Sequence, residues 1–130
     1  MPALEPVAGV RVVAAHAALD DAHWAGDDVD VLRIAPDEAL GLGAAGATVD
    51  ADPDAIVEAE AGFSVALLDR SELAALAAHT EWPLPVDGPA GTLAQGKIAG
   101  VPAKIVVGDP SLLVIQTAYA DELERRLGWR

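Results

Sequence analysis

Three side chains near the N-terminus have types and spacing that suit a metal ion. They are His16, Asp20 and His23, in the stretch "HAALDDAHW". If residues 15–25 form a helix, the three lie at positions i, i+4 and i+7 on one face. Two imidazoles and a carboxylate are a ligand set for Zn²⁺ or Fe²⁺. The spacing therefore predicts a candidate metal site, while His79 falls at the end of another predicted helix, where it favours capping.

The stretch "GLGAAG", residues 41–46, has the Gly-x-Gly-x-x-Gly spacing of dinucleotide-binding loops. Such a loop follows a buried strand and opens a helix whose N-terminus faces the pyrophosphate. Here a Pro36-Asp37 turn interrupts the preceding segment, and acids and Pro53 follow where the helix would run. We therefore interpret the glycines as a loop after a hairpin, and the sequence predicts no cofactor.

A second candidate, "DADPD", places Asp50, Asp52 and Asp54 at alternate positions, as a calcium-binding loop does. The sixth position of such a loop requires glycine and the twelfth requires glutamate. This chain has Ala55 and Ala61 at those positions. The pattern favours a solvated acidic loop.

No catalytic residue is predicted. The chain contains no cysteine, which excludes thiolate catalysis, disulfides and cysteine-bound zinc. No spacing of Ser, His and Asp indicates a triad. Glu58 and Glu60 would share a face of one strand, but acid pairs are common in a chain with so many carboxylates. The three tryptophans are typical of core or rim anchors.

Charge is the most informative bulk property. The chain has 21 acidic and 8 basic residues, a formal charge of −13, and its only lysines are Lys97 and Lys104. Such a surface repels nucleic acids and anionic membranes. Many acids with few lysines also suit concentrated salt, where a Debye length of about 3 Å screens self-repulsion. The composition predicts a halophilic protein; the alternative is an acidic protein from an alanine-rich, high-GC genome.

Length and hydropathy predict one domain, residues 1–130. No apolar run approaches the roughly 20 residues that span a bilayer. The opening "MPALEP" lacks the basic and then apolar order of a signal peptide. We therefore expect a soluble, cytoplasmic protein with no nucleic-acid or membrane partner.

The order of predicted elements indicates an α+β fold, an antiparallel sheet with two main helices. Asp69 and Glu72 form a capping-box pattern at the start of a helix over 69–79. A closing helix over 118–128 places Tyr119, Leu123 and Leu127 on one face. Strands are predicted at residues 10–14 (or the start of a helix), 29–35, 39–43, 55–68 as one bent strand or two, 92–100, 101–108 and 112–117.

The stretch "IVEAEAGFSVALLDRSEL" resembles a strand-strand-helix segment of sarcosine oxidase gamma subunits and of the related glycine-cleavage T-protein superfamily. Glu58, Phe63 and Glu72 stand at corresponding steps. "TLAQGKIAGVPAKIVV" is similar to that family's small-residue strand pair. "LLVIQTAYADELERRLG" resembles its last strand and helix, and "VLRIAPDEALGLG" its "PDE" hairpin. The resemblance covers about residues 29–128.

The resemblance implies a ferredoxin-like split β-α-β domain with added strands and a non-catalytic role beside larger subunits. This chain is shorter than typical gamma subunits and has no counterpart of the folate-gripping acidic motif of T-proteins. We therefore expect a non-catalytic small subunit or interaction module of one-carbon or amine metabolism, with larger oxidase or T-protein-like subunits as partners. The alternative is a small-molecule-binding or metal-dependent enzyme that uses the face of His16, Asp20 and His23. The sequence leaves oligomerisation open.

Overall fold

The computed structural model describes residues 2–130, and the chain divides into two compact units. Unit 2 is Val7–Ala61, and unit 1 combines the residues up to Pro6 with Gly62–Arg130. The structure is α+β with a mostly antiparallel sheet, which confirms the predicted class. A single domain over residues 1–130 stays a prediction.

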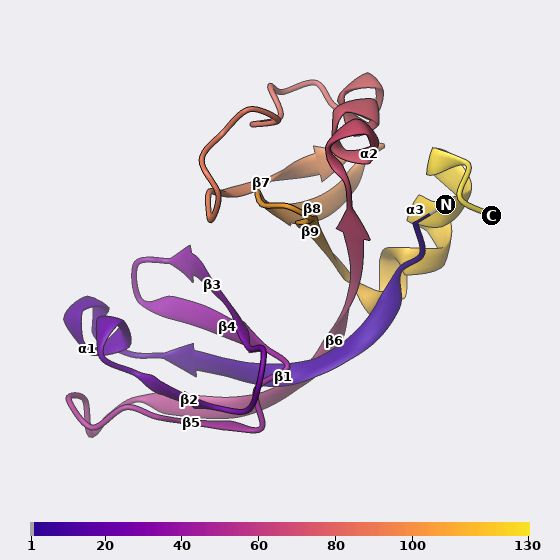
Figure 1. Cartoon of the computed structure of the whole chain (residues 1–130). Coiled ribbons are helices and arrows are strands. Elements are labelled where there is room, and N and C mark those ends of the chain that lie inside the picture. The colour runs from indigo at the N-terminus through magenta and orange to yellow at the C-terminus, as the bar shows by residue number, and fades with distance from the viewer. Residues whose placement is uncertain (1) are drawn as a thin grey trace. The chain divides into compact units, whose positions relative to one another are not determined.

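Unit 2 is built mainly from strands (Figure 1). Strand order in its larger sheet is β3-β4-β1-β6, and β4 pairs antiparallel with both β1 and β3. A separate antiparallel pair, β2-β5, and one short helix complete the unit. The bounds are β1 (Glu5–Val13), α1 (His16–Asp20), β2 (His23–Ala25), β3 (Asp30–Ala35), β4 (Glu38–Leu42), β5 (Gly46–Thr48) and the first half of β6 (Ile56–Leu68).

Small side chains make up the buried cluster of unit 2, and Leu32, Leu40 and Leu42 of β3 and β4 are buried outside this cluster. Its buried cluster contains one leucine, Leu19, among alanines and valines, and Trp24 packs against its margin. Only glycine fits at position 41, because a Cβ there would overlap the ring of Trp24. The remaining cluster members are Val10, Val12, Ala14, Ala18, Ala39 and Ala44.

Unit 1 is an antiparallel sheet with helices, in the strand order β6-β9-β8-β7. The chain passes from β6 through two helices to a three-strand meander and then to a closing helix (Figure 1). The bounds are α2 (Arg70–Ala75), the 3₁₀ helix η1 (Leu76–His79), β7 (Leu93–Ile98), β8 (Val101–Val106), β9 (Ser111–Gln116), the 3₁₀ helix η2 (Thr117–Tyr119) and α3 (Ala120–Leu127).

Large aliphatic side chains make the core of unit 1. Leu73 of α2, Leu76 of η1 and Leu123 of α3 pack with one face of the sheet. Alternate strand residues supply that face, as the period of two requires. The sheet residues of the cluster are Ala66, Leu68, Ile98, Val101, Ala103, Ile105, Leu113 and Ile115.

The capping box predicted for α2 is present. The Asp69 carboxylate accepts from the backbone N–H of Glu72 at 2.8 Å, and the Glu72 carboxylate accepts from the N–H of Asp69 at 2.9 Å. The N–H of Glu72 is the main cause that lowers the pKa of Asp69 below its ordinary value, and the Ser71 hydroxyl adds to the effect. Local hydrogen bonding thus starts this helix, as its sequence indicated.

Other predicted boundaries shift. The predicted helix over residues 15–25 is wrong beyond Asp20, since His23–Ala25 form strand β2. The predicted stripe on α3 is wrong at Tyr119, which precedes the helix and is 43% exposed. Residues 56–68 form one strand. Among the described residues, no helix combines the length and the apolar character that a membrane crossing requires.

Candidate functional site

The proposed metal ligands are held by other partners. Asp20 ends α1, and its Oδ1 accepts from Nη1 of Arg33 at 2.9 Å. Nη2 of Arg33 donates to the backbone oxygen of His16 at 2.7 Å, and Nδ1 of His16 lies 2.9 Å from the Pro36 oxygen. A guanidinium therefore already occupies the position between His16 and Asp20 that a cation would take.

His23 does not join these two residues on a helix. It lies in β2 opposite Thr48 of β5, because the chain leaves the helix after Asp20. Within residues 2–130, no group of three His, Cys, Asp or Glu side chains has the arrangement of a metal site. Metal binding by His16, Asp20 and His23 stays a prediction without geometric support.

The glycine-rich stretch 41–46 covers the end of β4, a turn at residues 43–45 and the first residue of β5. Gly43 adopts φ +86° between β4 and β5, a conformation that glycine reaches without steric cost. A strand follows this turn, so it lacks the helix N-terminus on which a dinucleotide loop depends. In the acidic loop, Asp52 accepts from the N–H groups of Ala15 and Asp54, which makes it a turn residue.

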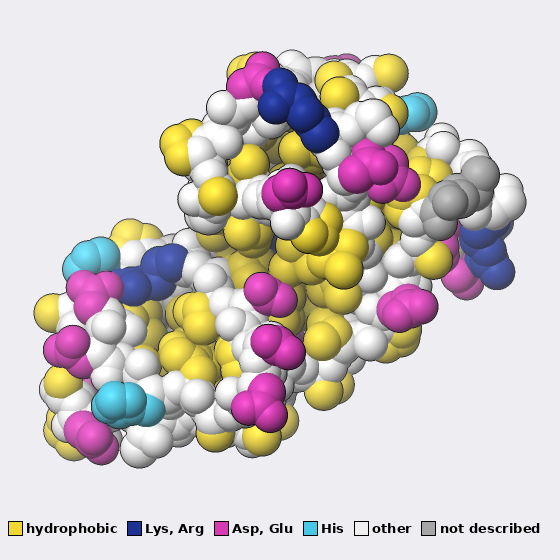
Figure 2. Space-filling view, in the orientation of Figure 1, with side chains coloured by type: hydrophobic (Ala, Val, Ile, Leu, Met, Phe, Trp, Pro, Cys, Tyr) yellow, Lys and Arg dark blue, Asp and Glu magenta, His cyan; other side chains and the backbone are white. Residues whose placement is uncertain are grey.

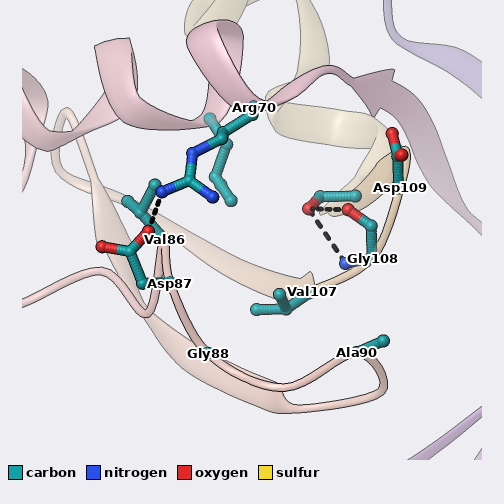
Figure 3. A pocket seen from close by; sticks show the side chains of 10 residues that line it. Arg70, Val86, Asp87, Gly88, Ala90, Val107, Gly108 and Asp109 are labelled. Carbon is teal, nitrogen blue, oxygen red and sulfur yellow. Dashed lines mark hydrogen bonds and ion pairs between the residues drawn. The ribbon is translucent and has the colours of Figure 1, made fainter.

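A hollow of about 280 Å³ lies in unit 1 beside the start of α2 (Figure 3). Leu73 and Val107 form its apolar lining, and Ser111 bonds to the backbone of Gly108. Arg70 and Asp87 form an ion pair at one side. Both partners are largely exposed, so the pair is weak, and it neutralises the only base of this hollow.

A second hollow, of about 680 Å³, lies beside Trp82. The indole lies over Gly96, where a Cβ would overlap it, and its Nε1–H donates to the oxygen of Lys97 at 2.8 Å. His79 and Glu81 also line this hollow, and the side chains of these two residues and Lys97 are exposed. Trp82 is therefore held at the rim of this hollow. His79, Glu81 and Lys97 form no ion pair with one another among the described ion pairs.

The best candidate for a binding surface in unit 2 is the first half of β6, residues 56–61. On one side β6 neighbours β1, and on the other it neighbours β9. The register with β9 runs only from Phe63 to Leu68. Among residues 2–130, no strand pairs with the side of residues 56–61 that faces away from β1. We name this side the β6 edge.

The side chains of residues 56–61 are exposed except the half-buried Glu60, and they are mixed in character. Ile56 is 52% and Val57 43% exposed, unusual values for large aliphatic residues of a strand. Glu58 and Glu60 alternate with Val57, Ala59 and Ala61, so that one face is acidic and the other apolar. An open ladder with β-branched residues is a template for another strand.

Arg11 of β1 balances part of this acidity. Its Nε donates to Glu38 at 2.5 Å, and its Nη1 lies 3.8 Å from Glu58. The hydrogen bond with Glu38 is the main cause that raises the pKa of Arg11, and the charges of Glu38, Glu58 and Glu60 add to it. One guanidinium serves three carboxylates, so the acidic face of the edge keeps a negative charge.

The acidic charge is concentrated in unit 2. Twelve acidic and two basic residues lie within Val7–Ala61, a formal charge of −10 out of −13. Both of these bases, Arg11 and Arg33, are already in ion pairs. On the face shown in Figure 2, Asp and Glu side chains far outnumber Lys and Arg. Unit 2, which contains the β6 edge, therefore has a strongly acidic surface.

No family model matches the chain, and no curated protein matches it. The candidate site therefore depends on geometry. Sequence reasoning assigned no role to Glu58 and Glu60, because acid pairs are frequent here. The signal that points to the edge is "IVEAEA", a β-branched alternating run with no Pro, Gly or Lys to protect an exposed strand.

Proposed function

We propose that this chain is a non-catalytic small subunit, an interaction module that docks on a larger protein. The observation that carries the proposal is the β6 edge, six residues of strand whose outer side has no partner strand among residues 2–130. Proteins usually protect such edges with Pro, Lys, bulges or covering segments. An edge that keeps exposed Ile56 and Val57 is suited to binding.

The two terminal strands of the seven-stranded sheet, β3 and β7, have better protected edges. Strand β3 has a register shift between Arg33 and Ala35, and bulges of this kind discourage edge-to-edge pairing. Strand β7 carries Lys97, and the Trp82 indole already takes the Lys97 oxygen. These contrasts favour the β6 edge as the docking surface.

The resemblance to sarcosine oxidase gamma subunits supports the class of partner. It points to a larger oxidase or T-protein-like subunit of amine or one-carbon metabolism. It also implies a ferredoxin-like split β-α-β arrangement, which belongs to this proposal, since the strand order of unit 1 carries only the coarser α+β assignment. Cytoplasmic location and adaptation to high salt are further parts of the proposal, and the charge of −13 supports the latter.

Purification of the tagged chain from its native cells in high salt tests this function. We expect a larger oxidase or T-protein-like subunit to co-purify in stoichiometric amount, identified by mass spectrometry. Elution of the 13.3 kDa chain alone would contradict the proposal. Stoichiometric zinc or iron that disappears in His16→Ala would instead favour the metal-dependent enzyme.

A further inference from the structure

We propose that the β6 edge binds an extended segment of the partner that carries Lys or Arg at alternate positions and joins the sheet as an added strand. This inference deepens the proposed function, since it names the surface and the chemistry of the segment that docks there. The backbone of residues 56–61 would supply the ladder, and their side chains would select the sequence. Strand addition of this kind combines main-chain hydrogen bonds with alternate side-chain contacts.

The acidic face of the edge selects a basic segment. Ile56, Glu58 and Glu60 share one face by the period of two. The Glu58 side chain is 60% exposed, and its only base among the described ion pairs is Arg11 at 3.8 Å. A lysine or arginine opposite Glu58 or Glu60 would form a cross-strand pair of opposite charge, which stabilises a sheet.

The apolar face accepts small or β-branched side chains. Val57, Ala59 and Ala61 lie there and are exposed. A partner strand with valine at the intervening positions would cover them. The matching segment therefore alternates base and aliphatic residue over about six positions.

A second copy of this chain fits the edge poorly. An antiparallel pair of β6 edges centred on Ala59 would place Glu58 of one copy opposite Glu60 of the other, and like charges directly opposite are destabilising. Each copy also brings the −10 charge of unit 2. Glu58 and Glu60 therefore disfavour pairing between two copies and favour a basic strand, so the same residues give solubility and specificity.

Two capped hexapeptides test the proposal with the full chain, one of sequence Lys-Val repeated three times and one of Glu-Val repeated three times. At low salt we expect the Lys peptide to bind at least about tenfold more tightly, and to protect amides of residues 56–61 from hydrogen exchange. Binding should weaken as KCl is added. Protection that falls on β7 or β3 instead would overturn the assignment.

A charge-matched pair of variants separates the edge from general acidity. Glu58→Lys/Glu60→Lys should reverse the preference between the peptides. Asp27→Lys/Glu81→Lys changes the net charge equally, from −13 to −9, at exposed sites outside strand β6, and should leave the preference unchanged. If both double variants lost the preference for the Lys peptide equally, the attraction would be non-specific and the proposal would be overturned. Circular dichroism melts check that each variant is folded.

The two proposals fail in different ways. If a larger subunit co-purifies equally well with Glu58→Lys/Glu60→Lys, the interaction module survives and the edge assignment falls. If the Lys peptide binds the edge while no larger subunit co-purifies, the edge assignment survives and the proposed subunit role falls. The unmodified chain could also dimerise at low salt in a concentration-dependent way. If Val57→Asp abolished that dimer, a second copy would occupy the edge and the basic-segment proposal would be overturned.

Discussion

The two units of this chain have opposite physical character. Unit 1 buries large aliphatic side chains from two α-helices and a 3₁₀ helix against a four-strand sheet. The buried cluster of unit 2 contains alanines and valines with a single leucine, and Leu32, Leu40 and Leu42 are buried outside it. Because hydrophobic stabilisation scales with buried apolar area, unit 1 holds most of the stabilising burial among these clusters.

The two units also differ in net charge. Unit 2 carries −10, whereas unit 1, with nine acidic and six basic residues, carries −3. The unit with the smaller buried cluster therefore also has the greater self-repulsion. A partner or concentrated cations would relieve that repulsion, so the comparison assigns stability mainly to unit 1 and interaction mainly to unit 2.

The largest expected effect is in the core of unit 1. Leu123→Ala should lower the free energy of unfolding by about 2–5 kcal/mol, because it removes a fully buried side chain of α3. Leu19→Ala in unit 2 should cost about 2 kcal/mol, at the low end of that range, since its small neighbours form a sparser cluster. Urea unfolding measures both. Exposed Arg125→Ala, with a change near 0.5 kcal/mol, is the control. If Leu19→Ala lowered the free energy of unfolding more than Leu123→Ala does, unit 1 would not be the main source of stability.

The glycine beneath Trp24 is expected to have the next largest effect. A Cβ at Gly41 would overlap the Trp24 ring, so Gly41→Ala should cost about 1–3 kcal/mol and shift tryptophan fluorescence to the red. Gly46 in the same unit has open space where a Cβ would stand, and Gly46→Ala should stay within about 0.5 kcal/mol. Similar melting temperatures for both variants would show that the indole moves aside freely.

Salt should act more strongly on unit 2. Between roughly 0.1 and 2 M KCl, screening relieves self-repulsion, and amide protection in β1 and β4 should rise by about 1 kcal/mol more than in β8 and β9. Salt also strengthens apolar burial, but that effect acts on both units. The difference between units, measured by native-state hydrogen exchange, therefore isolates the charge. Equal gains in both units would contradict a charge-driven salt response.

The smallest expected effect concerns the capping box of α2. Asp69→Ala should lower the melting temperature modestly at neutral pH. The folded-state pKa of Asp69 lies below its ordinary value of 3.8, so its contribution is complete above that value and is lost as the pH falls through the folded-state pKa. The difference between the wild type and Asp69→Ala should accordingly vanish in strong acid. Glu81→Ala, at an exposed loop position, is the control. A difference that persists in strong acid would assign the effect to packing.

Local signals in the sequence predicted the elements whose partners are close along the chain. Asp69 and Glu72 start α2 through hydrogen bonds three residues apart, and Pro36-Asp37 lies in the turn between β3 and β4. The run over residues 55–68 predicted one bent strand or two, and the structure has the single strand β6. The helix start and the turn follow from residue type and spacing because the interactions that form them are short in sequence, whereas the partner β9 of strand β6 is distant in the chain.

Tertiary pairing decided the rest. Residues 23–25 leave the predicted helix because they pair with β5, more than twenty residues away, and that pairing separates His23 from His16 and Asp20. The β6 edge exists because β9 ends its register at Phe63, which no pattern within "IVEAEA" reveals. The sequence by itself determined the α+β class, the strand character of residues 56–68 and their acidic alternation. Only the fold decided which side of that strand stays open, because strand pairing depends on residues far apart in the chain.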